Sequence, residues 1–261
     1  MKGRILDRIG MTASDVGYGE PRPGDNISAT HAAVDGKTQP VPAMTSDNTN
    51  PAGGVMSGAT DMAKWLMVQL DSGRVAGGSD LFSRATTREL WSIVTPINTN
   101  PGPAALPHLG ARFAGYALGL HARDYRGEQF LNHTGGLPGY ISIVGMMPGQ
   151  RLGIAILTNA ETSAMYPIIY HVLDHYLGVK QIPDYLKYYG DRADAQQAEL
   201  AKGNAAAAEA RDSTSRPSLA LERYVGTYRD AWYGDVAIAL EGGKPVIRFT
   251  RTPVLVGDMV H

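Results

Sequence analysis

The stretch that decides the fold reads Asn132-His133-Thr134-Gly135-Gly136-Leu137-Pro138-Gly139-Tyr140. A strand-like run ends in polar residues, and two glycines and a Pro-Gly turn follow. Glycine inside a strand lets another backbone or a ligand approach closely. A free N–H beside such a gap can point at a developing oxyanion, and the side chains of His133 and Thr134 can hold a carbonyl or carboxylate. The stretch therefore predicts a strand that lines a binding or catalytic site.

The chain around this stretch alternates apolar with small or polar residues. The predicted strands are 116–120, 129–133, 141–147 and 152–157. Because short Gly- and Pro-containing turns join them, we expect an antiparallel meander. Apolar residues at helical spacing predict helices at 58–72 and 79–95, before the sheet, and at 161–177, after it. This order predicts an α+β fold in which helices flank an antiparallel sheet.

The ends of the chain differ in composition from this middle part. Residues 1–11 resemble the end of a helix stopped by Gly10, and 12–52 predict a long irregular segment with one short hairpin. We expect residues 1–189 to form the domain that contains this sheet, 190–217 an Ala-rich linker, and 218–261 the start of a small β-rich domain.

Composition excludes several classes of protein. The 261 residues have a formal net charge of −1 and no basic excess, so nucleic acid is not expected as a partner. No apolar run has the length of a membrane span. The absence of cysteine excludes disulfides, thiolate metal sites and a cysteine nucleophile.

Several stretches together resemble the β-lactamase-related serine hydrolases, which include class C β-lactamases, DD-peptidases and esterases. His133-Thr134-Gly135 resembles the third motif of that superfamily, Lys-Thr-Gly or His-Thr-Gly on an inner edge strand. Tyr116-Ala117-Leu118-Gly119-Leu120 resembles the strand before this motif. The other similar stretches are Arg4–Met11, Pro51–Ser57 with Asp61–Leu66, and Leu221–Tyr228, the last resembling a β-rich domain appended to such hydrolases.

The resemblance implies an acyl-enzyme mechanism. A serine in Ser-x-x-Lys attacks a carbonyl, the lysine and a Tyr-x-Asn tyrosine manage its proton, and two backbone amides stabilise the oxyanion. By position, His133, Thr134 and Gly135 contact the substrate and the Gly136 amide is one oxyanion donor, so His133 and Gly136 are the candidate catalytic residues. Tyr18 matches a loop that rims the active site in relatives. The implied partner is a small-molecule or peptide-like acyl substrate, and no cofactor or metal is implied.

The chain departs from this pattern at the nucleophile. No serine lies three residues before a lysine, and no Tyr-x-Asn occurs. Ser46-Asp47-Asn48 spells a variant of the second motif but lies after the segment that should follow that motif, so we interpret it as coincidence. Ser57 is interpreted as a helix cap and not a nucleophile, with Gly58 as the other candidate cap of that helix. In the family the first two motifs lie upstream of the point matching Met1, so we expect a C-terminal portion of the catalytic domain that is inactive alone.

Three further expectations remain open at this stage. A non-catalytic substrate-binding module is the main alternative, and a metal protein using His171 and His175, with Asp174 nearby, is a weaker one. A sheet that lacks part of its domain exposes an edge, which predicts self-association. The compartment is undetermined, because relatives are often periplasmic or secreted and the first residues contain no signal peptide.

Overall fold

A computed structural model describes residues 1–17, 24–34, 36–44, 50–212 and 214–260. Their contacts divide the chain into two units, Met1–Gln196 and Gln197–His261, which are described separately. The long helix α5 (Tyr185–Glu209) runs across this division. Among the helices of the described residues, none combines the length and the hydropathy needed to cross a bilayer.

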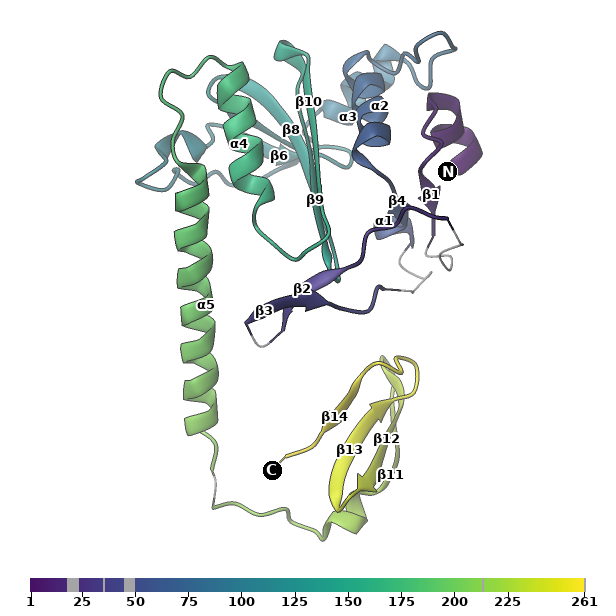
Figure 1. The fold of residues 1–261 in the computed structure, drawn as a ribbon, viewed down its shortest axis with the longest axis vertical. Coiled ribbons are helices and arrows are strands. Elements are labelled where there is room, and N and C mark those ends of the chain that lie inside the picture. Colours follow the sequence, from purple (N-terminus) through teal and green to yellow (C-terminus); the bar gives the residue numbers. More distant parts are fainter. Residues whose placement is uncertain (18–23, 35, 45–49, 213, 261) are drawn as a thin grey trace. The chain divides into compact units, whose positions relative to one another are not determined.

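The first unit is built on a mixed helix-and-sheet plan, as the sequence predicts (Figure 1). Among the described residues, six antiparallel strands form one sheet in the order β10-β9-β8-β7-β6-β5. The strands are β5 (Thr95–Pro96), β6 (Ala114–Tyr116), β7 (His121–Tyr125), β8 (Glu128–Leu137), β9 (Tyr140–Met147) and β10 (Leu152–Thr158). Short turns join the consecutive strands from β6 to β10, which gives the antiparallel meander that was expected. The strand expected over 116–120 is wrong, because β6 ends at Tyr116 and residues 117–120 form the turn to β7, a strand that was not predicted.

The two faces of this sheet carry separate cores, because successive side chains of a strand point to opposite faces. Phe130 of β8 packs with Ile169 and Leu173 of helix α4 (Met165–Tyr176). Leu131, the next residue, packs with Leu66 of helix α2 (Ala59–Leu70). Figure 1 shows the sheet between α4 on one side and α2 with α3 (Arg84–Trp91) on the other.

One helix is shorter than predicted, and the start of another shows which of two candidate residues caps it. The helix expected over 79–95 is restricted to α3, because the Ser83 hydroxyl accepts a hydrogen bond from the Thr86 amide and starts the helix there. Of the two candidate caps, Gly58 is the N-cap residue of α2, and no side chain caps that helix. The hydroxyl of Ser57 instead lies 2.7 Å from the hydroxyl of Ser14.

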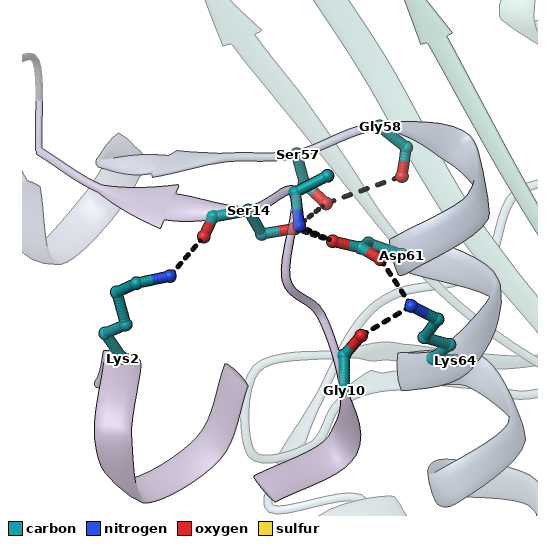
Figure 2. Close-up of polar contacts among 8 residues, drawn as sticks. Lys2, Gly10, Ser14, Ser57, Gly58, Asp61 and Lys64 are labelled. Carbon is teal, nitrogen blue, oxygen red and sulfur yellow. Dashed lines mark hydrogen bonds and ion pairs between the residues drawn. The ribbon is translucent and has the colours of Figure 1, made fainter. Parts of the chain in front are cut away.

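The N-terminal segment packs beside α2 through a buried carboxylate (Figure 2). It begins with a π-helix (Lys2–Leu6) and a 3-10 helix (Asp7–Ile9), and Asp61 of α2 then accepts hydrogen bonds from the Ala13 amide, the Ser14 hydroxyl and Lys64. Burial alone raises the pKa of the Asp61 carboxyl, but these bonds outweigh burial and hold the pKa below its usual range. The Asp61 carboxylate therefore holds residues 13 and 14 against α2 through these hydrogen bonds.

Five short elements of the described residues lie between this segment and α2 in the sequence. Strand β1 (Asp15–Val16) pairs with β4 (Val55–Met56), and helix α1 (Asn50–Gly53) precedes β4. Strands β2 (His31–Val34) and β3 (Lys37–Pro40) form the one hairpin expected in this region.

The start of α5 is fixed by a second buried carboxylate. Asp174 of α4 is 0% exposed and accepts two hydrogen bonds from Arg126 and one from each of the hydroxyls of Tyr125 and Tyr185. Burial alone raises the pKa of Asp174, but these donors outweigh it and hold the pKa below its usual range. The network joins the β7–β8 turn, α4 and α5. Beyond residue 190, α5 is exposed, in the region where an Ala-rich linker is predicted.

The second unit holds a four-stranded antiparallel sheet in the order β11-β12-β13-β14. The strands are β11 (Gly226–Asp230), β12 (Gly234–Glu241), β13 (Lys244–Phe249) and β14 (Val256–Asp258). A short 3-10 helix, Leu221–Tyr224, precedes them. The aromatic side chains of this second unit are largely on its surface, with Trp232 86% exposed.

Candidate active site

The stretch His133-Thr134-Gly135-Gly136 lies in the second half of β8, where the sheet opens. The ladder between β7 and β8 ends at the pair His121–Asn132, whereas the ladder between β8 and β9 continues to Leu137–Tyr140. From residue 133 to residue 137, β8 therefore has a strand partner on one side only among the described residues. We call residues 133–137 the open edge.

The register decides which amides of the open edge are free of the ladder. In an antiparallel ladder, hydrogen-bonded and non-hydrogen-bonded pairs alternate. The Leu137–Tyr140 pair closes a two-residue turn and is hydrogen-bonded, so residues 135 and 133 also bond to β9. The Tyr125–Glu128 pair closes the turn between β7 and β8, and places the bonds of residues 130 and 132 toward β7. Both ladders therefore agree that the amides of Thr134 and Gly136 point to the open side.

The two glycines of the open edge meet different surroundings. A Cβ atom on Gly135 would lie 2.6 Å from the hydroxyl oxygen of Ser142, so the Ser142 side chain would have to shift. A Cβ atom on Gly136 would lie 3.5 Å from Ile141 Cδ1, which is an ordinary contact. Residues 133–136 are exposed, so the side chains of His133 and Thr134 and the backbone of the two glycines are accessible to a ligand.

The turn that ends β8 is braced by residues far away in the sequence. Gly139 has a φ of 78°, its amide donates to Glu161 Oε1 at 3.0 Å, and its carbonyl accepts from the His31 amide at 3.4 Å. A Cβ atom on Gly139 would lie 2.3 Å from Thr30 Cβ. The hydroxyl of Tyr140 donates to the carbonyl of Ser28. The segment before β2 thus fixes the position of the open edge.

Two rings from neighbouring strands surround the imidazole of His133. Its Nε2 lies 3.0 Å from the hydroxyl of Tyr116, on β6. The ring of His121, on β7, lies 6.2 Å from that of His133 and 4.9 Å from that of Tyr116, centroid to centroid. Tyr116 was predicted on the preceding strand, but neither ring was assigned to the site. No local signal in the sequence indicated them, because their position depends on how β7 pairs with β6 and β8.

Other predicted positions lie outside this site. Tyr18 and Ser46-Asp47-Asn48 fall outside the described residues. The metal alternative is not supported, because the carboxylate of Asp174 is buried and bound by Arg126. Across the described parts of the chain, no group of three or more His, Cys, Asp or Glu side chains is placed to hold a metal ion.

Comparison with known proteins defines the class. A sequence model of the beta-lactamase family matches residues 1–176, and the chain belongs to this family. A model described as a domain of unknown function (DUF3471) matches residues 210–261.

Two curated relatives are fungal hydrolases. An unguisins hydrolase of Aspergillus campestris is 28% identical over 215 residues, which cover 77% of this chain and 36% of that protein. One of Aspergillus violaceofuscus is 26% identical over 212 residues, which cover 77% of this chain and 37% of that protein. The chain thus spans little more than a third of the length of these relatives.

A solved structure shares the fold. The octameric penicillin-binding protein homologue from Pyrococcus abyssi superposes with a TM-score of 0.58 at 17% identity, over 98% of this chain and 48% of that one. At this identity the similarity supports the fold alone. Together with the family match, it confirms the predicted β-lactamase/transpeptidase-like α+β fold.

Proposed function

We propose that this chain supplies the substrate-binding wall of a serine hydrolase that cleaves an amide, ester or β-lactam through an acyl-serine. The observation that carries the proposal is the open edge of β8, where the amides of Thr134 and Gly136 are free of the ladder and lie next to the imidazole of His133. In this proposal the Gly136 amide donates to the oxyanion, and His133, Thr134 and Gly135 line the bound acyl group.

The nucleophile is not among residues 1–261 in a form that this mechanism uses. The chain contains neither Ser-x-x-Lys nor Tyr-x-Asn. Ser57 hydrogen-bonds with Ser14, and the nearby Lys64 Nζ donates to Asp61 at 2.8 Å and to the Gly10 carbonyl, so it is engaged away from Ser57. We therefore propose that the chain alone forms no acyl-enzyme.

The substrate class follows from this wall and from the relatives. The Aspergillus relatives are named as hydrolases of unguisins and the Pyrococcus neighbour as a penicillin-binding protein homologue. A small-molecule or peptide-like acyl compound fits an open strand edge, which offers backbone donors and acceptors to an extended ligand. Organisation into residues 1–189, a linker over 190–217 and a β-rich part over 218–261 belongs to the same proposal.

The first test measures turnover and labelling. Nitrocefin and a p-nitrophenyl ester are incubated with the 261-residue chain, and a serine-reactive fluorophosphonate is followed by intact mass. We expect no turnover and no added mass. Stoichiometric labelling of a serine would contradict the proposal.

A second candidate function is a non-catalytic binding module, which the absence of Ser-x-x-Lys favours. The two functions differ in what the open edge prefers, because an oxyanion donor binds a tetrahedral anion more tightly than the planar amide. The test compares an unreactive phosphonate monoester with its matched amide. A hydrolase wall binds the phosphonate more tightly, whereas equal affinities would favour the binding module.

Variants of Gly136 provide the matched control for that comparison. Gly136→Pro deletes the amide N–H, and because this amide faces the open side, no ladder bond is lost. Gly136→Ala keeps the amide, and its Cβ has room. We expect the phosphonate preference to disappear in Gly136→Pro and to persist in Gly136→Ala. Its persistence in both would contradict the role of Gly136.

A further inference from the structure

Three rings meet at the point where the sheet opens, and each comes from a different strand. Tyr116 ends β6, His121 begins β7, and His133 is the first residue of β8 past its ladder with β7. The hydroxyl of Tyr116 lies 3.0 Å from His133 Nε2. The rings of Tyr116 and His121 meet edge to face, with an interplanar angle of 80°. Register across two ladders therefore builds this cluster.

An exposed imidazole at a strand edge can rotate and can carry its proton on either nitrogen. In a neutral imidazole one nitrogen donates and the other accepts, and the hydrogen bond of one nitrogen sets the state of the other. The phenol of Tyr116 reaches Nε2 of His133, which leaves Nδ1 as the nitrogen without an assigned contact in the described part of the chain. The phenol of Tyr116 therefore contacts the one side chain of the open edge that can exist as two neutral tautomers, which is His133.

We propose that Tyr116 is a positioning residue for His133: its hydroxyl donates to Nε2, fixes the ring orientation and places the proton on Nδ1. His121 packs against the Tyr116 ring and holds the phenol in place. The Nδ1–H then acts as a donor for a carbonyl or carboxylate oxygen of the acyl substrate. This last step rests on the proposed function, whereas the tautomer of His133 does not.

The test reads the tautomer directly. Long-range proton–nitrogen NMR spectra of the histidine rings are recorded on the full chain at a pH where His133 is neutral. We expect the Nδ1–H form in the unsubstituted chain and a shift to the Nε2–H form, which free imidazole side chains favour in water, in Tyr116→Phe. An Nε2–H form in the unsubstituted chain, or the same tautomer in both proteins, overturns the proposal.

Tyr140→Phe is the matched control. It removes a phenol hydroxyl close to the same edge, but that hydroxyl donates to Ser28 and not to His133. The His133 tautomer should be unchanged in this variant, and a shift equal to that in Tyr116→Phe would overturn the proposal. Melting curves of all three proteins check that the fold is retained.

A ligand arm separates this inference from the proposed function. Benzylpenicillin is titrated into the unsubstituted chain and into Tyr116→Phe. Loss of one hydrogen bond that orients a binding group is expected to weaken binding about fivefold. If neither protein binds while the tautomer still shifts, the role of Tyr116 stands and the proposed function fails. Equal affinities overturn the contribution of Tyr116 to binding.

Discussion

Replacing the buried carboxylate of Asp174 tests how the β7–β8 turn, α4 and α5 are held together. Asp174→Asn keeps the side-chain volume but removes the charge that Arg126 binds through two hydrogen bonds of 2.7 and 2.9 Å. Breaking one side of a buried ion pair costs about 3–5 kcal/mol. The Arg126 side chain is 25% exposed and can be partly rehydrated, so we expect the lower end, about 3 kcal/mol.

The pH dependence of this effect follows from the depressed pKa of Asp174. The carboxylate contributes its stability above the unfolded-state pKa, about 3.9, and loses it as the pH falls through the lower folded-state pKa. The difference in the free energy of unfolding between the unsubstituted chain and Asp174→Asn should therefore be largest at pH 7 and should decrease below about pH 4.

Urea unfolding followed by tryptophan fluorescence measures both effects. Trp65 and Trp91 belong to the first unit, whereas the exposed Trp232 reports little on burial. Asp191→Asn is the control, because it breaks a surface pair with Lys187 and should leave the midpoint unchanged. Equal midpoints for the two variants at pH 7 would refute the reasoning.

Three further predictions concern the open edge and the sheet. In amide hydrogen exchange, Thr134 and Gly136 should exchange faster than Gly135, and equal protection would argue against the register used above. Gly139→Ala should lower the free energy of unfolding by about 2–4 kcal/mol from left-handed strain and overpacking. Gly178 has a φ of 70° but open space around it, so Gly178→Ala should lower the free energy of unfolding by the backbone strain alone, and therefore by less. Equal decreases for the two variants in urea unfolding would exclude a contribution from the contact with Thr30. β10 is an outer strand of the six-stranded sheet, so we propose that its edge drives concentration-dependent association. Light scattering should show dimers of the unsubstituted chain and monomers of Leu157→Lys. An unsubstituted chain that is monomeric at all concentrations would contradict this proposal.

The sheet around the open edge was predictable because its signals are local. Alternating apolar residues and the turns at Arg126-Gly127 and Pro138-Gly139 indicated β8, β9 and β10 in their order, whereas β7 was not predicted. Loss of the β7 partner after residue 132 was not predictable, since it depends on where a different strand begins. For the same reason the rings of Tyr116 and His121 were missed as neighbours of His133.

Helix ends show the limit of local reasoning. Ser57 looks like a cap because it precedes α2, but its hydroxyl meets Ser14, which is distant in the sequence. The helix expected over 79–95 is limited to α3, where Ser83 starts it. A capping residue competes with every tertiary partner within reach, and the sequence does not show those partners.

The most direct test of the account is an amide-resolved NMR titration of the 261-residue chain with benzylpenicillin. Because the open edge is the proposed substrate-binding wall, we expect the largest chemical-shift changes at the amides of Thr134 and Gly136, with unchanged signals in the β11–β14 sheet. Saturable shifts elsewhere with none along residues 133–137, or no binding at all, would contradict it.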